Sequence, residues 1–239
     1  QYGDATYTSG MNVYTTISSR DQEAAYQAIR RGVLGYDHRH GYRGPEAFID
    51  FPESTHGIPD NIKEALEKHP SSDGMISAIV TQASPAQVKA MLTDGSIATI
   101  SGNGLKFAAS CLGRGGDKQI KRGSIIRISN TKGEWAITQL PAIDAALVSL
   151  NPSNGAIRAL VGGFDFANKQ FNHATQAWRQ PGSSFKPFIY SAALEKGFAP
   201  TSIINDAPVS FANGSGQNWN PKNYDNVYDG PITMRQALM

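Results

Sequence analysis

Five short segments rich in β-branched and other apolar residues follow one another between residues 75 and 140. Turn dipeptides such as Asp94-Gly95 and Lys132-Gly133 separate them, and these dipeptides are typical of β-hairpins. Five short strands in so small a region predict an antiparallel barrel of the OB type, closed or nearly closed. The expected strands are 75–83, 88–92, 96–100, 124–129 and 135–140.

The predicted barrel should bury one apolar residue from each strand. OB barrels often bind oligonucleotides in a groove where basic and aromatic side chains alternate. Trp135 and Phe107 are the only large aromatic rings between residues 75 and 140, so a structural or protein-docking role is favoured over nucleic-acid binding. The expected core residues are Ile79, Val88, Ile97, Ile126 and Ile137.

The sequence before the predicted barrel indicates one strand and two helices. Residues 11–17 alternate and are rich in β-branched side chains, which favours a strand. A helix should follow, capped by Ser18 or Ser19, and run to about Leu34 before Gly35. A second, shorter helix is expected near 62–67. The apolar stripe of the first helix consists of Ala25, Ile29 and Val33.

Arg30, Arg31, Arg39 and Arg43 form a basic cluster at and beyond the end of the first helix. Cations in this position interact favourably with the negative end of the helix dipole. A solvated helix end is therefore the favoured interpretation. A docking surface for an anionic partner is the alternative.

Beyond residue 142 the pattern predicts a hairpin followed by a helix. The apolar segments 144–150 and 156–161 flank a turn at 151–155, which indicates two antiparallel strands. Pro181-Gly182 interrupts the chain, and Pro187 fits a helix only near its first turn, so a helix should start at about Ser183. Gly197 is expected to end it.

Ser183 and Lys186 are three residues apart at this predicted helix start, so their side chains share a face. A serine becomes a good nucleophile when a neighbouring base takes its proton, and an unprotonated lysine can be that base. The N–H groups and positive dipole of a helix start also favour a developing oxyanion. Ser129 and Lys132 have the same spacing but lie in a predicted turn, where no helix aligns them.

Other candidate chemistry is weaker. His173 and Asp165 could suggest a Ser-His-Asp triad, but Lys186 already provides a base, and nothing in the sequence places His173 near Ser183. No metal or organic cofactor is expected, because the remaining histidines lack partners at metal-ligand spacing. These histidines are His38, His40, His56 and His69.

The composition of the 239 residues is ordinary for a globular protein, with 40% hydrophobic and 18% charged residues. A net charge of +2 gives no support to nucleic-acid binding. No run reaches the ~18 apolar residues of a membrane helix, and the chain opens without a signal-peptide pattern. Cys111 is the only cysteine, which excludes an internal disulfide. Composition thus leaves the compartment open.

Four segments in order closely resemble class A penicillin-binding proteins: 148–155 (VSLNPSNG), 159–164 (ALVGGF), 171–174 (FNHA) and 179–188 (RQPGSSFKPF). Residues 36–45 (YDHRHGYRGP) resemble the 1A type of Gram-negative bacteria. The resemblance implies a bifunctional periplasmic protein, anchored in the inner membrane upstream of this chain. Its transpeptidase would cross-link peptidoglycan stem peptides and react with β-lactams, with Ser183 as the acylated nucleophile and Lys186 as the base.

The resemblance also implies an α+β organisation in three parts. Residues 1–45 would be an interdomain linker strand and helix, 46–141 an OB-like domain with an irregular lead-in, and 142–239 the first part of a serine transpeptidase domain. Core packing or loop anchoring is the favoured role for the aromatic residues Trp219 and Tyr224. The alternative is that they form a wall of the acyl-donor groove.

The family's Ser-x-Asn and Lys-Thr-Gly motifs do not occur after Lys186. We therefore expect a fragment that is catalytically silent by itself. One alternative is a non-catalytic docking fragment whose OB-like domain binds an outer-membrane lipoprotein activator. A β-lactamase would share Ser-x-x-Lys but would not be expected to carry the linker and barrel.

Overall fold

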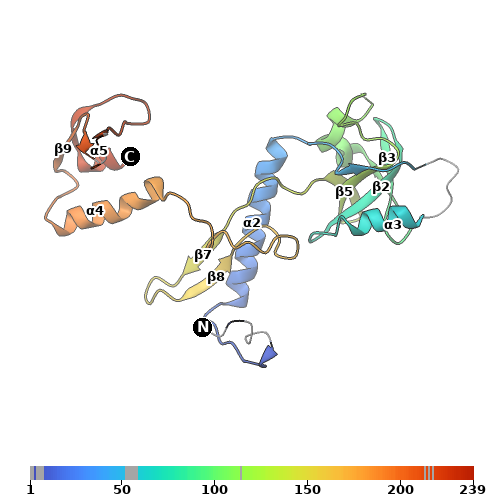
Figure 1. The fold of residues 1–239 in the computed structure, drawn as a ribbon, viewed down its shortest axis with the longest axis horizontal. Helices are drawn as coiled ribbons and strands as arrows, with labels where there is room; N and C mark the ends of the chain where they lie inside the picture. The colour runs from blue at the N-terminus through green and yellow to red at the C-terminus, as the bar shows by residue number, and fades with distance from the viewer. Residues whose placement is uncertain are drawn as a thin grey trace. The chain divides into compact units, whose positions relative to one another are not determined.

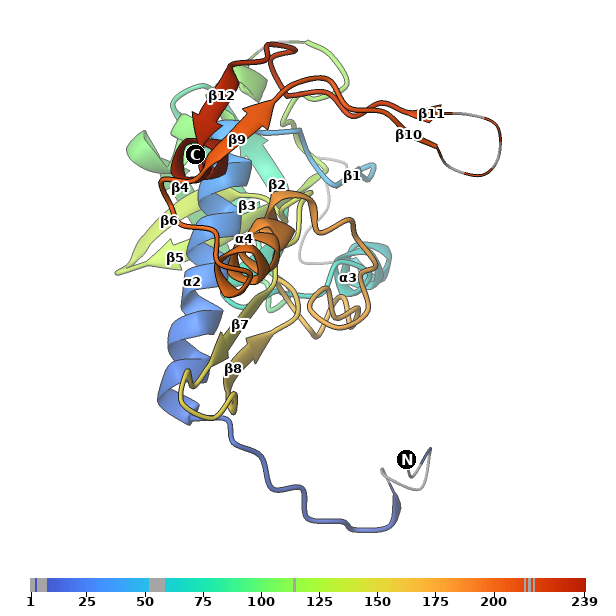
Figure 2. The same ribbon diagram turned by 90° about the vertical axis from the view of Figure 1, so that its left-hand side faces the viewer.

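The structure is a computed structural model that describes residues 3, 8–51, 59–113, 115–212, 214, 216 and 218–239. It is a mixed α and β fold that divides into two units, Gln1–Ala177 and Trp178–Met239 (Figures 1 and 2). The first unit contains α2 (Ser19–Arg39), β1 (Ala47–Phe48), α3 (Asp60–Glu67), β2 (Met75–Ala83), β3 (Gln87–Met91), β4 (Ile97–Ser101), the 3₁₀ helix η1 (Gly102–Cys111), β5 (Ser124–Thr131), β6 (Glu134–Thr138), β7 (Leu147–Leu150) and β8 (Ile157–Val161). The second contains the 3₁₀ helix η2 (Gly182–Phe185), α4 (Lys186–Glu195), β9 (Ile203–Asp206), β10 (Phe211–Ala212), β11 (Asn218–Trp219), β12 (Gly230–Thr233) and α5 (Met234–Leu238).

All five strands predicted between residues 75 and 140 are present as β2 to β6, and they are antiparallel. Their order is β5-β2-β3-β4, and β6 pairs with the other edge of β5, where β1 also pairs. No pairing of β4 with β6 occurs among the described strands. The strands therefore have the expected antiparallel arrangement, but hydrogen bonds do not close the barrel.

The helix η1, which the sequence pattern did not predict, packs against both β4 and β6. A Cβ placed on Gly104 of η1 would lie 2.1 Å from the Trp135 carbonyl oxygen and 2.9 Å from Ile100 Cγ2. Only glycine permits this approach. Helix packing, and not a sixth strand pairing, thus completes the wall of the barrel.

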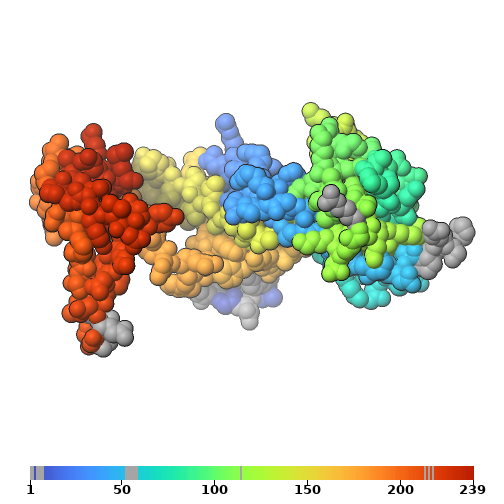
Figure 3. Space-filling model, turned by 90° about the horizontal axis from the view of Figure 1, so that it is seen from above, coloured from blue at the N-terminus to red at the C-terminus, as the bar shows by residue number. Residues whose placement is uncertain are grey.

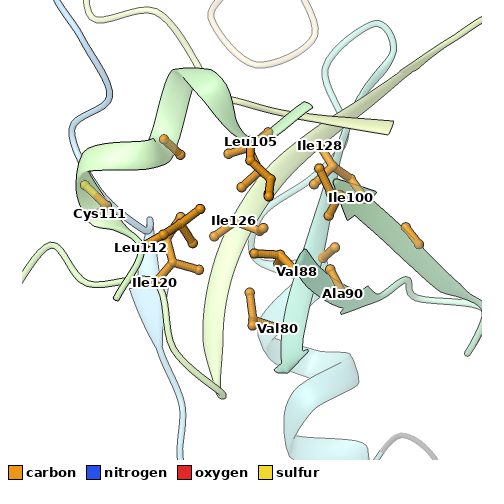
Figure 4. Packing of buried hydrophobic residues seen from close by; sticks show 14 of the residues in the cluster. Val80, Val88, Ala90, Ile100, Leu105, Cys111, Leu112, Ile120, Ile126 and Ile128 are labelled. Atoms are coloured by element: carbon orange, nitrogen blue, oxygen red, sulfur yellow. The ribbon is translucent and has the colours of Figure 1, made fainter. Parts of the chain in front are cut away.

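The barrel core confirms four of the five predicted core residues. Val88 and Ile126 are buried in one cluster (Figure 4). Ile137 belongs to the same cluster, and Ile79 is buried in a neighbouring one. The prediction for Ile97 was wrong, because its side chain is 50% exposed. In β4 the inward positions are Ala98 and Ile100, and a shift of one residue moves a side chain to the other face of a strand.

The helix α2 packs on the β7–β8 hairpin through the predicted apolar stripe (Figure 1). The Ser18 side chain caps the helix by accepting a hydrogen bond from the Asp21 N–H at 3.4 Å. The helix continues past Gly35 to Arg39, since an internal glycine weakens a helix without necessarily ending it. In the described part of the chain, no helix is long and apolar enough to cross a membrane. The stripe residues Ala25, Ile29 and Val33 are buried with Ala159, Val161 and Phe164.

Residues 11–17 do not form the predicted strand. Thr16 Oγ1 donates to the Ile157 carbonyl at 2.7 Å, and the Ser18 N–H donates to the Arg158 carbonyl at 3.0 Å. These contacts reach the outer edge of β8 but do not make a ladder. Val13 and Tyr14 are exposed, so no burial fixes an extended register.

Of the four arginines predicted as a solvated cluster, Arg31 and Arg39 are exposed as expected, whereas Arg30 and Arg43 have partners of their own. Arg30 is buried and pairs with Asp73 at 3.0 Å. Arg43 pairs with Asp37 at 2.7 Å and also donates to the Leu140 carbonyl. Neither the solvated helix end nor an anion-docking surface describes these two side chains.

Prediction for the barrel core. The Ile126→Ala variant should lower the free energy of unfolding by about 2–5 kcal/mol, because it removes a fully buried side chain. The Ile97→Ala variant should cost about 1 kcal/mol or less, the span of strand propensity, because Ile97 is half exposed. Urea unfolding compares the two. Equal losses would contradict the orientation of β4.

Prediction for the barrel wall. The Gly104→Ala variant should destabilise the protein by about 1–3 kcal/mol, because the added methyl group collides with the backbone of β6. Gly32 provides the matched control, since it lies within α2 and has no atom within 4 Å of an added Cβ. The Gly32→Ala variant should gain about 0.5–1 kcal/mol. Thermal unfolding measures both, and a neutral Gly104→Ala would show that η1 does not seal the wall.

Candidate active site

Ser183 lies in a short 3₁₀ helix that leads directly into α4. Gly182, at φ +52°, takes the left-handed conformation that starts the turn, which favours glycine. The Lys186 N–H donates to the Ser183 carbonyl. Residues three apart eclipse each other in a 3₁₀ turn, so Ser183 and Lys186 share the face that the sequence predicted. Gly197, at φ +90°, follows the end of α4 as expected.

The pair is aligned but not enclosed. Ser183 is exposed, and Lys186 is partly exposed. Lys186 Nζ donates to the Leu238 carbonyl of α5 at 3.5 Å, and no hydrogen bond joins it to Ser183 Oγ within the described residues. The apolar side chains of α4 also face water, including Phe188 at 68% and Ile189 at 57% exposure. Solvent therefore reaches both the candidate nucleophile and the candidate base.

A hollow of about 460 Å³ opens one turn beyond Lys186. Tyr190 of α4 lines it, together with parts of β9, β12 and α5 and the loop 223–229. Tyr190 is four residues after Lys186 and so lies on the same side of the helix. Tyr190 was not among the predicted site residues, although its spacing from Lys186 could have identified it.

The two aromatic residues predicted for the acyl-donor groove have different surroundings. Tyr224 is fully exposed and lines the hollow beside Tyr190. Trp219 is 60% exposed and stacks on Phe211, with 5.4 Å between ring centroids. Neither ring is buried in a core, so their role as a groove wall remains a prediction.

The loop that carries Tyr224 is held by Asp206 at the end of β9. Asn223 Nδ2 donates to both Asp206 carboxylate oxygens at 2.9 Å, and the Asp229 N–H donates to the same carboxylate at 3.0 Å. The hydrogen bonds from Asp229 and Asn223 hold the pKa of Asp206 below its ordinary value. No spacing signal in the sequence pointed to Asp206, because its partners come from a loop that only the fold brings close.

The second Ser-x-x-Lys match lacks the helical geometry, as predicted. Ser129 lies in β5 and pairs with Met75 on one side and Ala136 on the other. Lys132 lies in the following turn at φ +55°. Ser129 and Lys132 are therefore not aligned by a helix.

The described histidines have partners within the first unit. His173 Nε2 lies 3.9 Å from Asp144 Oδ2, while Asp165 accepts from Asn168 and from the Ala167 N–H. No group of three or more His, Cys, Asp or Glu side chains that could hold a metal occurs in the described residues. His38 stacks on Phe107, His40 stacks on Tyr36, His69 bonds to Glu46, and His56 lies outside the described residues.

Comparison with known proteins identifies both halves of the chain. Residues 42–143 match the family model of the penicillin-binding protein OB-like domain, and residues 145–239 match that of the penicillin binding protein transpeptidase domain. The chain is 44% identical over 246 residues to penicillin-binding protein 1A of Neisseria flavescens and 42% identical over 249 residues to that of Escherichia coli K12. Both alignments include the whole chain, which spans 30% and 29% of these relatives.

A solved structure gives the same result. The crystal structure of penicillin-binding protein 1A from Haemophilus influenzae matches with a TM-score of 0.75 and 40% identity, over 94% of this chain and 33% of that one. The chain therefore belongs to the penicillin-binding proteins, carries their OB-like domain followed by transpeptidase-domain sequence, and is similar throughout to 1A-type members from Gram-negative bacteria.

Proposed function

We propose that this chain supplies the nucleophile Ser183 and the base Lys186 to a serine D-Ala-D-Ala transpeptidase of peptidoglycan synthesis. The observation that carries the proposal is the single 3₁₀ turn that joins the two residues at the start of α4. This turn lies within the residues that match the transpeptidase family model. The relatives' name, penicillin-binding protein 1A, agrees with a serine that β-lactams acylate.

The proposed reaction transfers a peptidyl group in two steps. Lys186 Nζ takes the Ser183 Oγ proton while Oγ bonds to the carbonyl carbon of the D-Ala-D-Ala peptide bond. The C–N bond breaks, the departing D-alanine nitrogen receives a proton, and the stem peptide remains as an ester on Ser183. An amine of a neighbouring stem then attacks the ester, which forms the cross-link and frees Ser183. No metal or organic cofactor takes part in these steps.

The location of Ser183 at a helix start supports the acylation step. The Ser184 N–H donates to the Pro181 carbonyl and the Lys186 N–H to the Ser183 carbonyl. The N–H groups proposed to stabilise a developing oxyanion are therefore the earlier ones, at Gly182 and Ser183. A β-lactam would use the same attack, because its ring amide resembles the donor peptide bond, and would leave an ester that hydrolyses slowly.

The wider setting of the protein is also a proposal. We place the complete protein in the periplasm, anchored to the inner membrane, with the chain divided at 1–45, 46–141 and 142–239. The two family models, which meet between residues 143 and 145, support the last of these divisions. A lipoprotein activator on the OB-like domain remains the alternative role, and it requires neither Ser183 nor Lys186.

Prediction for the nucleophile. In a complete protein that contains this chain, Ser183→Ala should abolish covalent labelling by a fluorescent penicillin, whereas Ser129→Ala should leave it intact. Lys186→Ala should slow acylation by at least ~10²-fold, as expected for loss of a positioned base. Labelling is followed on denaturing gels. Persistent labelling of Ser183→Ala would refute the mechanism, and no labelling of the unmutated protein would favour the docking role.

Prediction for the isolated chain. The 239-residue chain alone should not be labelled by fluorescent penicillin at a rate comparable with a complete protein. Water reaches Ser183 and Lys186, and the activation of a lysine base requires an environment that lowers its pKa. The same gel assay tests this, with the complete protein as the positive control. Stoichiometric labelling of the isolated chain would contradict the expectation.

A further inference from the structure

Three residues near the C-terminal half of α2 contact the OB-like domain, defined here as residues 42–143. Arg30 and Asp37 are seven residues apart, which is two helical turns and about 10 Å along the axis, so they lie on the same side of α2. His38 follows Asp37, and its ring stacks on Phe107 of η1 at 3.9 Å between centroids. The apolar stripe on the adjacent face of α2 packs against β8 and also contacts Met75 of β2.

The guanidinium of Arg30 joins three separate segments of the chain. Its Nε lies 3.0 Å from Asp73 Oδ2, and its Nη2 donates to the Asp73 carbonyl at 3.1 Å, in the turn before β2. Its Nη1 donates to the Phe164 carbonyl at 3.3 Å, just after β8, and its Cζ lies 4.2 Å from the centre of the Phe164 ring. Only 7% of the Arg30 side chain is exposed. Because an unpaired buried charge is strongly unfavourable, these contacts hold one another in place.

The backbone of Asp73 provides independent evidence that this junction is specified. Asp73 has φ +36°, in the left-handed region that glycine adopts more readily. A non-glycine residue persists there when its surroundings determine its position. Besides Arg30, the Tyr26 hydroxyl of α2 donates to Asp73 Oδ2 at 3.0 Å. The two contacts of the Asp73 carboxylate thus explain why this position is an aspartate, although its backbone conformation favours glycine.

The buried carboxylate of Asp37 fixes both chain connections of the barrel. Arg43, in the segment that leads into the barrel, donates through Nη1 at 2.7 Å. Gln139 Nε2 donates at 2.7 Å and the Ala142 N–H at 3.1 Å, both from the segment that leaves β6. The segment that enters the domain and the segment that leaves it therefore both donate hydrogen bonds to the Asp37 carboxylate of α2.

We propose that Arg30 and Asp37 make α2 an interdomain clamp that holds the OB-like domain and the β7–β8 hairpin as one rigid body. Domains joined by short connections move relative to each other by default, unless their interface is extensive. Here two buried polar anchors and the apolar stripe act on the same helix, and the atoms of α2 lie directly against those of the barrel (Figure 3). A partner that binds the OB-like domain would thereby act on the hairpin through α2. The inference does not depend on the proposed transpeptidase activity.

The test measures the distance between the two parts with spin labels in the whole 239-residue chain. Thr99→Cys on β4 and Ser153→Cys in the hairpin turn carry the labels, in a Cys111→Ala background; both labelled positions are exposed. Pulsed electron resonance should give one narrow distance distribution. The combined Asp73→Gly and Asp37→Ala substitutions should widen it at least about twofold, as free domain motion returns.

Two controls separate the clamp from a general loss of structure. Asp73→Gly suits the left-handed backbone, so this single substitution removes the ion pair without adding strain. Hydrogen exchange of the β2 and β5 amides shows whether the combined variant folds. If it does not fold, the distance distribution of the single Asp73→Gly variant tests the clamp instead. Glu23→Ala removes an acid of α2 that accepts a hydrogen bond from Gln27 of the same helix, and it should leave the distance distribution unchanged. A broad distribution in the unsubstituted chain, or no widening in Asp73→Gly, would overturn the proposal.

Discussion

The arrangement of α2 between the barrel and the hairpin depends on a buried cation, Arg30. Arg30 lies inside the contact between α2, the turn before β2 and the segment after β8, and its charge is matched by Asp73 and by two carbonyl oxygens. A buried guanidinium is tolerated only when its donors are satisfied, so the three segments must meet in one geometry. The apolar stripe of α2 packs against the hairpin, and the ion pair between Arg30 and Asp73 sets the position of α2 relative to the barrel.

A comparable constraint determines how the barrel is completed. The sheet ends at β4, and the ten-residue helix η1 crosses from β4 to β6 in place of a hydrogen-bonded closure. Gly104 makes this possible, because its lack of a side chain lets the helix backbone touch the backbone of β6. The barrel core of isoleucine, valine and alanine is therefore sealed by helix packing on this side.

The candidate active site meets one requirement of catalysis, the alignment of nucleophile and base, but not the other, an environment shielded from water. Local chain geometry aligns Ser183 with Lys186, since Gly182 starts the turn and the Lys186 N–H closes it. Local geometry does not lower the dielectric constant around them, and both side chains remain accessible to water. Alignment is thus a property of a few consecutive residues, whereas tuning of the base requires surrounding structure.

The sequence alone determined the features that depend on neighbouring residues. Hydrophobic periodicity located β2 to β6, α2 and the hairpin. Pro181-Gly182 located the start of the 3₁₀ helix that carries Ser183, although the α-helix itself begins at Lys186. Tertiary structure decided what periodicity does not encode: the outward face of Ile97, the absence of a strand at 11–17, the closure by η1, and the loop held by Asp206. Arg30 shows the reason most clearly, because its partner is 43 residues away in the chain, and only folding shows that a charged residue is buried there.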